Sequence, residues 1–271
     1  MPGSRSLRLG LLYPLEMNLY GDRGNVLALV RRAALRGVEL EVRTLGLDTG
    51  DPDDIAACSG FLIGGGQDLD QLALAHDLVA RKGPALREQV ADGAPLLAVC
   101  AGYQLLGEHY RTAAGDLIPG LGILPLRTEA GRRRLVGNVL VAANAGLGLA
   151  NPLLVGFENH SGRTILEPGL SPLGKVVRGR GNDGESGLEG AVLGSVLGTY
   201  LHGPLLPKNP ALADWWVFTA AERTGTTLDR SQLDDSAEET ARREAIRITL
   251  SGSRTRGYHL LGRRPRIRRT G

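Results

Sequence analysis

The residue with the clearest setting for chemistry is Cys100. It directly follows the apolar run PLLAV and directly precedes AGYQLLG. A cysteine on a sharp turn between a buried strand and a helix lies at the carboxyl edge of a sheet, which is the arrangement of a nucleophile elbow. Helix N–H groups favour a thiolate there, and the small residues Ala101 and Gly102 let a substrate approach the backbone. A buried structural cysteine is the alternative. We favour this structural role for Cys58, which does not lie between a buried strand and a helix.

A thiolate nucleophile needs a base, and histidine is the usual one. His202 ends the apolar run GSVLGTYL, so we expect it at a sheet edge and take it as the candidate base. His160, in the polar segment FENHSGR, is the second candidate, expected in a loop after a strand. His76 and His109 fall in segments expected to be helical, and His259 lies near the C-terminus, so we expect no catalytic role for them.

Three consecutive glycines, residues 64–66, end the apolar run GFLI. Glycines at the end of a strand present bare backbone N–H groups, which can hold a phosphate or an oxyanion. No Lys-Ser/Thr pair follows, so the loop is not a P-loop. We therefore assign an oxyanion hole to the N–H groups of Ala101 and Gly65. Gln104, one helical turn after Cys100, is a candidate contact for the substrate.

Metal and dinucleotide sites are not indicated. No Cys-x-x-Cys, His-Glu-x-x-His or EF-hand spacing occurs, so the sequence predicts neither a metal nor another cofactor. Residues 179–184 match the glycine pattern of a dinucleotide site, but the polar segment ESGLEG follows where a helix is required. We interpret this segment as a mobile polar loop.

The positive charge is concentrated in the last 21 residues. The 271 residues carry 32 basic and 29 acidic groups, a net charge of +3. Residues 251–271 hold seven arginines and no acid, which leaves the other 250 residues with 25 basic and 29 acidic groups, a net −4. A mildly acidic body argues against binding to nucleic acid. No apolar run is long enough to span a membrane, and two cysteines form no disulfide framework, so we predict a cytoplasmic protein.

The order of the elements indicates an α/β fold. In the first half, strands are expected at 7–13, 38–45, 60–63 and 94–99, and helices at 23–37, 67–83 and 84–93. Such alternation predicts a mostly parallel, flavodoxin-like sheet with helices on both faces. Further strands are expected at 120–126, 134–144, 152–160 and 192–204, and helices near 209–224 and 236–250. We predict one domain, 1–250, and a basic, disordered tail, 251–271. An arm for an anionic membrane or an acidic partner is the alternative for this tail.

Together these features resemble class I, Triad-type glutamine amidotransferases. Many members carry His-x-Glu, whereas this chain has His202-Gly203-Pro204, as in the CobB/CobQ-like branch. Within that branch, the chain over residues 7–250 resembles the glutaminase subunits of lipid II isoglutaminyl synthase. The segments that carry this resemblance are YPLEMNLYGDRGN (13–25), GGGQDLDQ (64–71), CAGYQLLG (100–107), GLGILPL (120–126), VGFENHSGRT (155–164) and GTYLHGPLLPKNP (198–210).

The resemblance implies an activity and a partner. Such subunits hydrolyse L-glutamine and pass ammonia to a MurT-like, Mur-ligase-type subunit. With ATP, that subunit converts D-glutamate of the lipid II stem peptide to D-isoglutamine, a step of peptidoglycan biosynthesis at the inner face of the membrane. The partner would form a heterodimer with the chain and supply the ATP site and the third acid of the triad. An arginine that binds glutamine matches Arg134, and its neighbours Arg132 and Arg133 are alternatives.

Three alternatives remain at this point. The chain could serve another CobB/CobQ-like amidotransferase, such as one that amidates cobyrinate, although 271 residues leave no room for the usual fused ATP-binding domain. It could be a non-catalytic binding subunit that kept the fold, but the intact Cys100, His202 and glycine loop argue against this. It could also use the same cysteine and histidine on another amide or ester.

Overall fold

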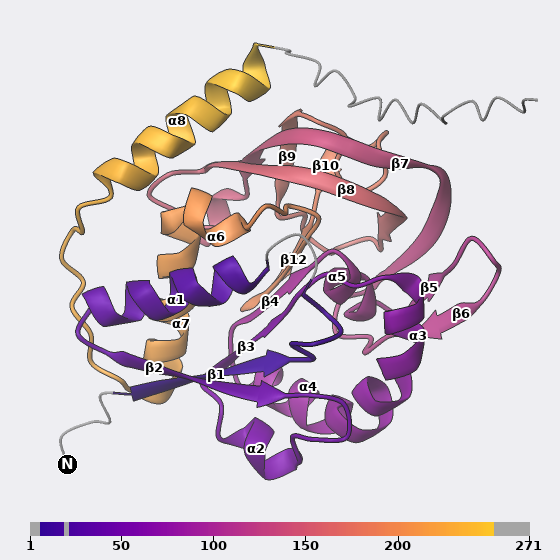
Figure 1. Ribbon diagram of the computed structural model, residues 1–271, viewed down its shortest axis with the longest axis horizontal. Coiled ribbons are helices and arrows are strands. Elements are labelled where there is room, and N and C mark those ends of the chain that lie inside the picture. Colours follow the sequence, from indigo (N-terminus) through magenta and orange to yellow (C-terminus); the bar gives the residue numbers. More distant parts are fainter. Residues whose placement is uncertain (1–5, 19–21, 252–271) are drawn as a thin grey trace, which may run out of the picture.

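The computed structural model describes residues 6–18 and 22–251 (Figure 1). Four apolar runs of the first half and two later strands form a six-stranded sheet. Its strands run in the order β11-β12-β4-β3-β1-β2, and all neighbours are parallel except β11 and β12. Every residue of β3 and β4 is buried, as expected for a parallel sheet that is covered on both faces. The strands are β1 (Ser6–Leu12), β2 (Glu39–Leu45), β3 (Gly60–Ile63), β4 (Leu96–Val99), β11 (Ala191–Leu193) and β12 (Val196–Thr199).

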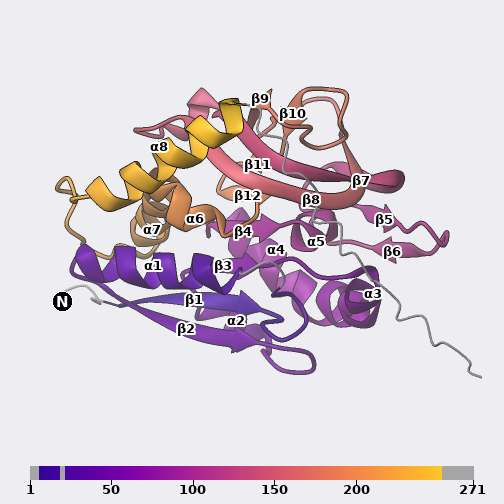
Figure 2. The same ribbon diagram turned by 45° about the horizontal axis from the view of Figure 1, so that its top comes forward.

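Helices cover both faces of this sheet (Figure 2). One group packs together and consists of α1 (Arg23–Leu35), α6 (Leu205–Lys208) and α7 (Pro210–Thr224). The other consists of α2 (Pro52–Ala56), α3 (Asp68–His76), a π-helical turn (Asp77–Lys82) and α4 (Gly83–Ala91). The short helix α5 (Ala101–Leu105) follows β4 directly. The predicted strand–helix alternation of the first half is therefore confirmed.

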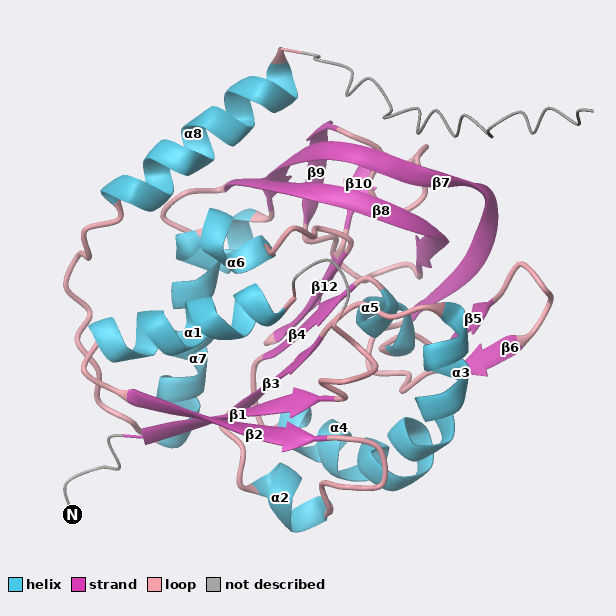
Figure 3. Ribbon diagram, viewed as in Figure 1, coloured by secondary structure: helices cyan, strands magenta, loops and turns pink. Residues whose placement is uncertain are grey.

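The strands between residues 109 and 189 form a separate sheet, seen mostly above the first in Figure 3. Its order is β10-β9-β7-β5-β6, and β8 pairs with β7. Pairing between β7 and β8 is irregular between Ala130 and Leu135, and this irregularity contains the three consecutive arginines 132–134. The strands are β5 (His109–Arg111), β6 (Leu117–Pro119), β7 (Leu126–Ala143), β8 (Leu153–Leu166), β9 (Gly174–Arg178) and β10 (Leu188–Glu189), and a 3₁₀ turn (Ala145–Leu147) joins β7 to β8.

Two sequence predictions about this region were wrong. Residues 120–125 are not a strand, because the backbone of 120–124 bonds instead to residues 105–108 at and after the end of α5, and only Leu126 belongs to a strand, β7. His109 lies on β5 and not in a helix. Both errors arise because β5 and β6 have only three residues each, too few to show a period.

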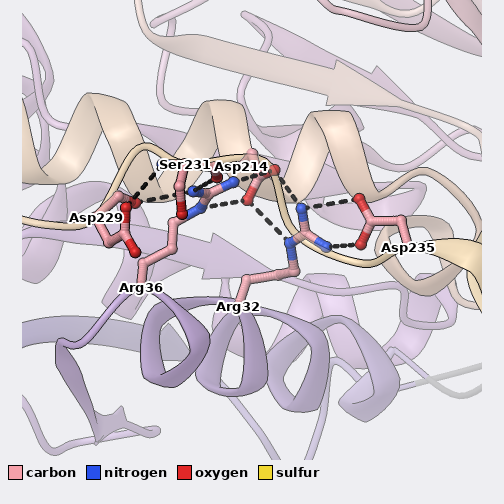
Figure 4. Close-up of polar contacts among 6 residues, drawn as sticks. All are labelled: Arg32, Arg36, Asp214, Asp229, Ser231 and Asp235. Carbon is pink, nitrogen blue, oxygen red and sulfur yellow. Dashed lines mark hydrogen bonds and ion pairs between the residues drawn. The ribbon is translucent and has the colours of Figure 1, made fainter.

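A network of ion pairs holds α1 against α7 (Figure 4). Asp214 of α7 accepts hydrogen bonds from Arg36, at 2.8 and 2.9 Å, and from Arg32, which also pairs with Asp235. Burial alone would raise the pKa of Asp214, but these hydrogen bonds lower it below its ordinary value. Arg32, Arg36, Asp214 and Asp235 also contribute to the lining of a cavity of about 980 Å³ between α1, α7 and the chain before α8.

The last described element is α8 (Ser236–Leu250), and of the predicted tail 251–271 all but Ser251 lies outside the described residues. Among residues 6–18 and 22–251, no helix has the length and apolar character needed to cross a membrane.

Candidate active site

Four groups meet at the carboxyl edge of the first sheet. In the order β12-β4-β3, each strand is followed at its carboxyl end by a residue of the candidate site, His202, Cys100 and Gly65 respectively, and Asp22, which directly precedes α1, lies beside them. A Cβ atom on Gly65 would lie 3.2 Å from His202 Cε1, 3.4 Å from Asp22 Oδ2 and 3.5 Å from Cys100 Cβ. Cys100, His202 and Gly65 are therefore brought together as predicted, and Asp22 joins them.

The turn at Cys100 is strained, as a nucleophile elbow requires. Cys100 has φ +54° and ψ −106°, a region that residues with a side chain seldom occupy. Its N–H donates to Thr199 O of β12 at 2.8 Å, and the N–H of Gly102 donates to Gly64 O at 3.1 Å. These bonds to β12 and to the glycine loop hold the turn, so the neighbouring chain compensates for the strain.

The resting pair is uncharged. Burial, and then the nearby Asp22 carboxylate, raise the pKa of Cys100 to about 12, although a hydrogen bond from the Ala101 N–H acts in the opposite direction. Burial, with a smaller contribution from the charge of Arg134, lowers the pKa of His202 to about 4. The Ala101 N–H therefore favours the thiolate, as expected, but burial has the larger effect on the pKa of Cys100. Since α5 has only five residues and the sulfur is buried, the loss of hydration raises the pKa of Cys100 more than the single Ala101 N–H lowers it.

The glycine loop carries an unexpected bond. The N–H of Gly65, predicted to serve the oxyanion hole, donates to Asp22 Oδ2 at 2.6 Å. Asp22 Oδ1 lies 4.0 Å from His202 Nδ1, and the carboxylate is 2% exposed. Burial raises the pKa of Asp22 to about 7, against the lowering effect of the Gly65 bond. Sequence reasoning missed Asp22, although it lies in the YGDRGN segment that carries the family resemblance.

The second sheet positions His202. His202 and Phe157 of β8 exchange backbone hydrogen bonds of 2.8 and 3.1 Å. His160, expected in a loop, lies within β8 and is buried, with its ring stacked on Tyr200 at a centroid distance of 3.5 Å. Its Nδ1 is 2.9 Å from Gly162 O, and burial lowers its pKa to about 3. These contacts favour His202 as the base and give His160 a place in the wall of the site.

A cavity of about 460 Å³ opens beside Cys100. Arg134 lines it, whereas Arg133 lines a neighbouring cavity of about 300 Å³ that also includes Arg134, and Arg132 lines neither of the two. The guanidinium of Arg134 donates to Asn159 Oδ1 at 2.9 Å and to Asn159 O at 2.8 Å. The cavity beside Cys100 is lined by Gly66, Gln67, Asp68, Leu69, Gln71, Cys100, Gln104, Arg134, Asn159, His160 and Ser161.

Gln104 lines the same cavity and is buried. Its Oε1 accepts from Gln71 Nε2 at 3.1 Å, and its Nε2 donates to the Tyr200 hydroxyl at 3.1 Å. Because both ends of the amide already have partners, Gln104 shapes the wall of the cavity.

The remaining cysteine and the described acids indicate no further centre. Cys58 is buried in the core, and both cysteines are free. In the part of the chain that the structure describes, no three His, Cys, Asp or Glu side chains are grouped as metal ligands. In the glycine pattern at 179–184, the N–H groups of Arg180 and Gly181 donate to Glu158, which fixes this loop to β8.

Comparisons with known proteins agree with this geometry. Residues 8–210 match the model of the CobB/CobQ-like glutamine amidotransferase domain. The chain is 40% identical over 231 residues to the lipid II isoglutaminyl synthase (glutamine-hydrolyzing) subunit GatD of Staphylococcus aureus, covering 85% of this chain and 91% of that protein. It is 38% identical over 135 residues to a cobyric acid synthase of Pelotomaculum thermopropionicum, covering only 25% of that protein. The solved structure of PurLQS from Thermotoga maritima is similar in fold, with a TM-score of 0.53 and 16% identity over 80% of this chain and 96% of that one.

Proposed function

The chain belongs to the CobB/CobQ-like glutamine amidotransferase family, and we propose that it is the glutaminase subunit of a lipid II isoglutaminyl synthase. The single observation that carries the chemistry is the convergence of Cys100, His202 and Gly65 at the carboxyl ends of adjacent strands. The likeness to GatD over most of both chains supports the choice of pathway, because the cobyric acid synthase is matched over only a quarter of its length.

The first half of the reaction forms a thioester. Because the thiol and the imidazole are both neutral at rest, His202 takes the thiol proton as Cys100 Sγ attacks Cδ of the glutamine side chain. The carbonyl oxygen becomes an oxyanion, which the N–H groups of Ala101 and Gly65 stabilise. One such donor typically contributes about 3–4 kcal/mol. His202 then returns the proton to the amide nitrogen, the C–N bond breaks and ammonia leaves.

The second half regenerates the enzyme. Water attacks the γ-glutamyl thioester while His202 removes one of its protons, the C–S bond breaks, and that proton returns to the Cys100 sulfur. The products of one turnover are glutamate and ammonia. Arg134 binds the α-carboxylate of glutamine, since a guanidinium matches a carboxylate in a two-bond geometry and this arginine shares the cavity with Cys100. Gln104 forms the wall against which the substrate lies.

We further propose a MurT-like partner in a heterodimer. This partner holds the ATP site and accepts the ammonia, and its lipid II substrate places the complex in the cytoplasm at the inner face of the membrane. A Mur-ligase-like chain that co-purifies with this protein supports the proposal, whereas a cobalamin-pathway enzyme in its place contradicts it.

The test of the glutaminase uses the two cysteines of the chain as a matched pair. Glutamate release from L-glutamine is measured for the wild type, for Cys100→Ala and for Cys58→Ala, with and without the co-purified ligase. We expect release to be abolished only by Cys100→Ala. Equal release by Cys100→Ala and the wild type would refute the mechanism.

A further inference from the structure

The cavity beside Cys100 carries one negative and one positive side chain. Of the described residues that line it, Asp68 is the only acid and Arg134 the only arginine or lysine. The Asp68 carboxylate accepts from the Tyr110 hydroxyl at 3.2 and 3.3 Å, and the Arg134 guanidinium donates to Asn159. Over the two described stretches of the chain, neither charge forms an ion pair with the other or with a third residue. The cavity therefore holds two opposite charges whose partners must come from a ligand.

A second acceptor lies on the same face of α3. Asp68 is the first residue of this helix, and Gln71, three positions later, also lines the cavity and is 1% exposed. Gln71 Nε2 donates to Gln104 Oε1 at 3.1 Å, and Gln104 Nε2 donates in turn to the Tyr200 hydroxyl, which fixes the direction of both amides. Among the described residues, Gln71 Oε1 has no hydrogen-bond partner. A buried oxygen on a cavity wall without a donor indicates a ligand that brings one.

The charges of a free amino acid match this arrangement. L-glutamine carries an α-carboxylate and an α-ammonium group on one carbon, and Arg134 is already assigned to the carboxylate. The ammonium group has three donors and no acceptor, so it needs oxygen atoms around it, and a charged one binds it more strongly than a neutral one. Asp68 supplies a carboxylate and Gln71 a carbonyl oxygen on the same wall. Asn159 Oδ1, also on the wall, already accepts from Arg134.

We propose that Asp68 binds the α-ammonium group of glutamine, with Gln71 Oε1 as the second acceptor. The inference rests on the proposed glutaminase function and specifies which form of glutamine the site accepts. A glutamine inside a peptide has an amide on each side of its α-carbon, so it offers no charge to Asp68 or to Arg134. The two charged walls therefore restrict the reaction to the free amino acid, while Cys100 and His202 carry out the bond breaking.

Glutaramate, which is glutamine without its α-ammonium group, separates this contact from the others. For the full chain with its co-purified ligase, kcat and KM are measured for L-glutamine and for glutaramate. In Asp68→Asn we expect KM for L-glutamine to rise about 10- to 30-fold, with kcat changed less than about threefold. KM for glutaramate should not rise, because this substrate has no ammonium group to lose. Asparagine keeps an oxygen for the Tyr110 hydroxyl, so the wall stays in place.

Asp70→Asn is the matched control, because it removes the same charge from the same turn of α3. Asp70 does not line the cavity, and asparagine keeps an oxygen for the Gln67 N–H, so KM for L-glutamine should change less than about twofold. Gln71→Met removes the second acceptor and should raise KM for L-glutamine about threefold, again without a rise for glutaramate. An unchanged KM for L-glutamine in Asp68→Asn, or an equal rise with both substrates, would overturn the proposal.

Binding measured without turnover separates this subsite from the reaction. In the Cys100→Ala background, isothermal titration calorimetry gives the Kd of L-glutamine with and without Asp68→Asn. A loss of affinity of about tenfold or more supports the subsite, and equal affinities overturn it. If the wild type with its ligase hydrolyses no glutamine while this loss of affinity is seen, the proposed glutaminase function is refuted and the ammonium subsite stands.

Discussion

Replacing Arg134 by alanine tests how the cavity recognises its substrate. Hydrogen bonds to a charged group contribute about 1.5–3 kcal/mol. Because Arg134 is exposed, we take about 2 kcal/mol for its pairing with the α-carboxylate, which corresponds to about a 30-fold loss in kcat/KM. We expect this loss in KM with kcat nearly unchanged, since the guanidinium does not reach the bond that breaks. Steady-state glutamate release at varied L-glutamine measures both constants.

Two controls make this result specific. Arg133→Ala removes the same charge from the neighbouring cavity, which does not include Cys100, and should leave KM within about twofold. With the α-amide of L-glutamine, which lacks the carboxylate, Arg134→Ala and the wild type should have the same KM. An unchanged KM for L-glutamine in Arg134→Ala, or a raised KM in Arg133→Ala, would refute the assignment.

Four further changes follow from the same geometry. His202→Ala should lower kcat about 100- to 10,000-fold without unfolding the chain, as checked by circular dichroism and glutamate release. Gly65→Ala should abolish turnover at an unchanged melting temperature, since its methyl group would lie 3.2 Å from His202 Cε1. Because burial lowers the pKa of His202 to about 4, the imidazole stays neutral down to that pH, so kcat/KM should hold down to about pH 4 and fall below it; a fall near pH 6.5, the ordinary value of histidine, would contradict this. Asp214→Asn leaves the buried Arg32 short of a partner and should lower the free energy of unfolding by about 3 kcal/mol in urea titrations. The lowered pKa of Asp214 means that this difference is present above about pH 4 and is lost in more acidic solution.

The parallel sheet and the positions of the candidate site residues were predictable for a clear reason. Fully buried strands appear as continuous apolar runs, and the chemistry of such sheets lies at their carboxyl ends, so Gly65, Cys100 and His202 could be found from the sequence. The second sheet was only partly predictable. Its long strands β7 and β8 were expected as shorter runs, and His160 was placed in a loop because the polar sequence around it hides its buried position.

Asp22 was not predictable from local pattern. It stands in a polar segment before a helix, where an acid usually signals only a helix start. Its place in the site follows from the fold, which brings the start of α1 close to residues about 40, 80 and 180 positions away in the chain. The raised pKa of Cys100 could not be predicted for a similar reason. Burial of the sulfur is a property of the assembled site, and it affects this pKa more than the short helix that follows Cys100.

The central claim is that Cys100 hydrolyses glutamine through a covalent intermediate. The most direct measurement is the mass of the intact chain after rapid quenching with L-glutamine, followed by identification of the modified peptide. The account predicts a γ-glutamyl adduct on the peptide that contains Cys100, none on the peptide that contains Cys58, and no adduct in Cys100→Ala. Glutamate formation that continues in Cys100→Ala, or an adduct on another residue, would contradict it.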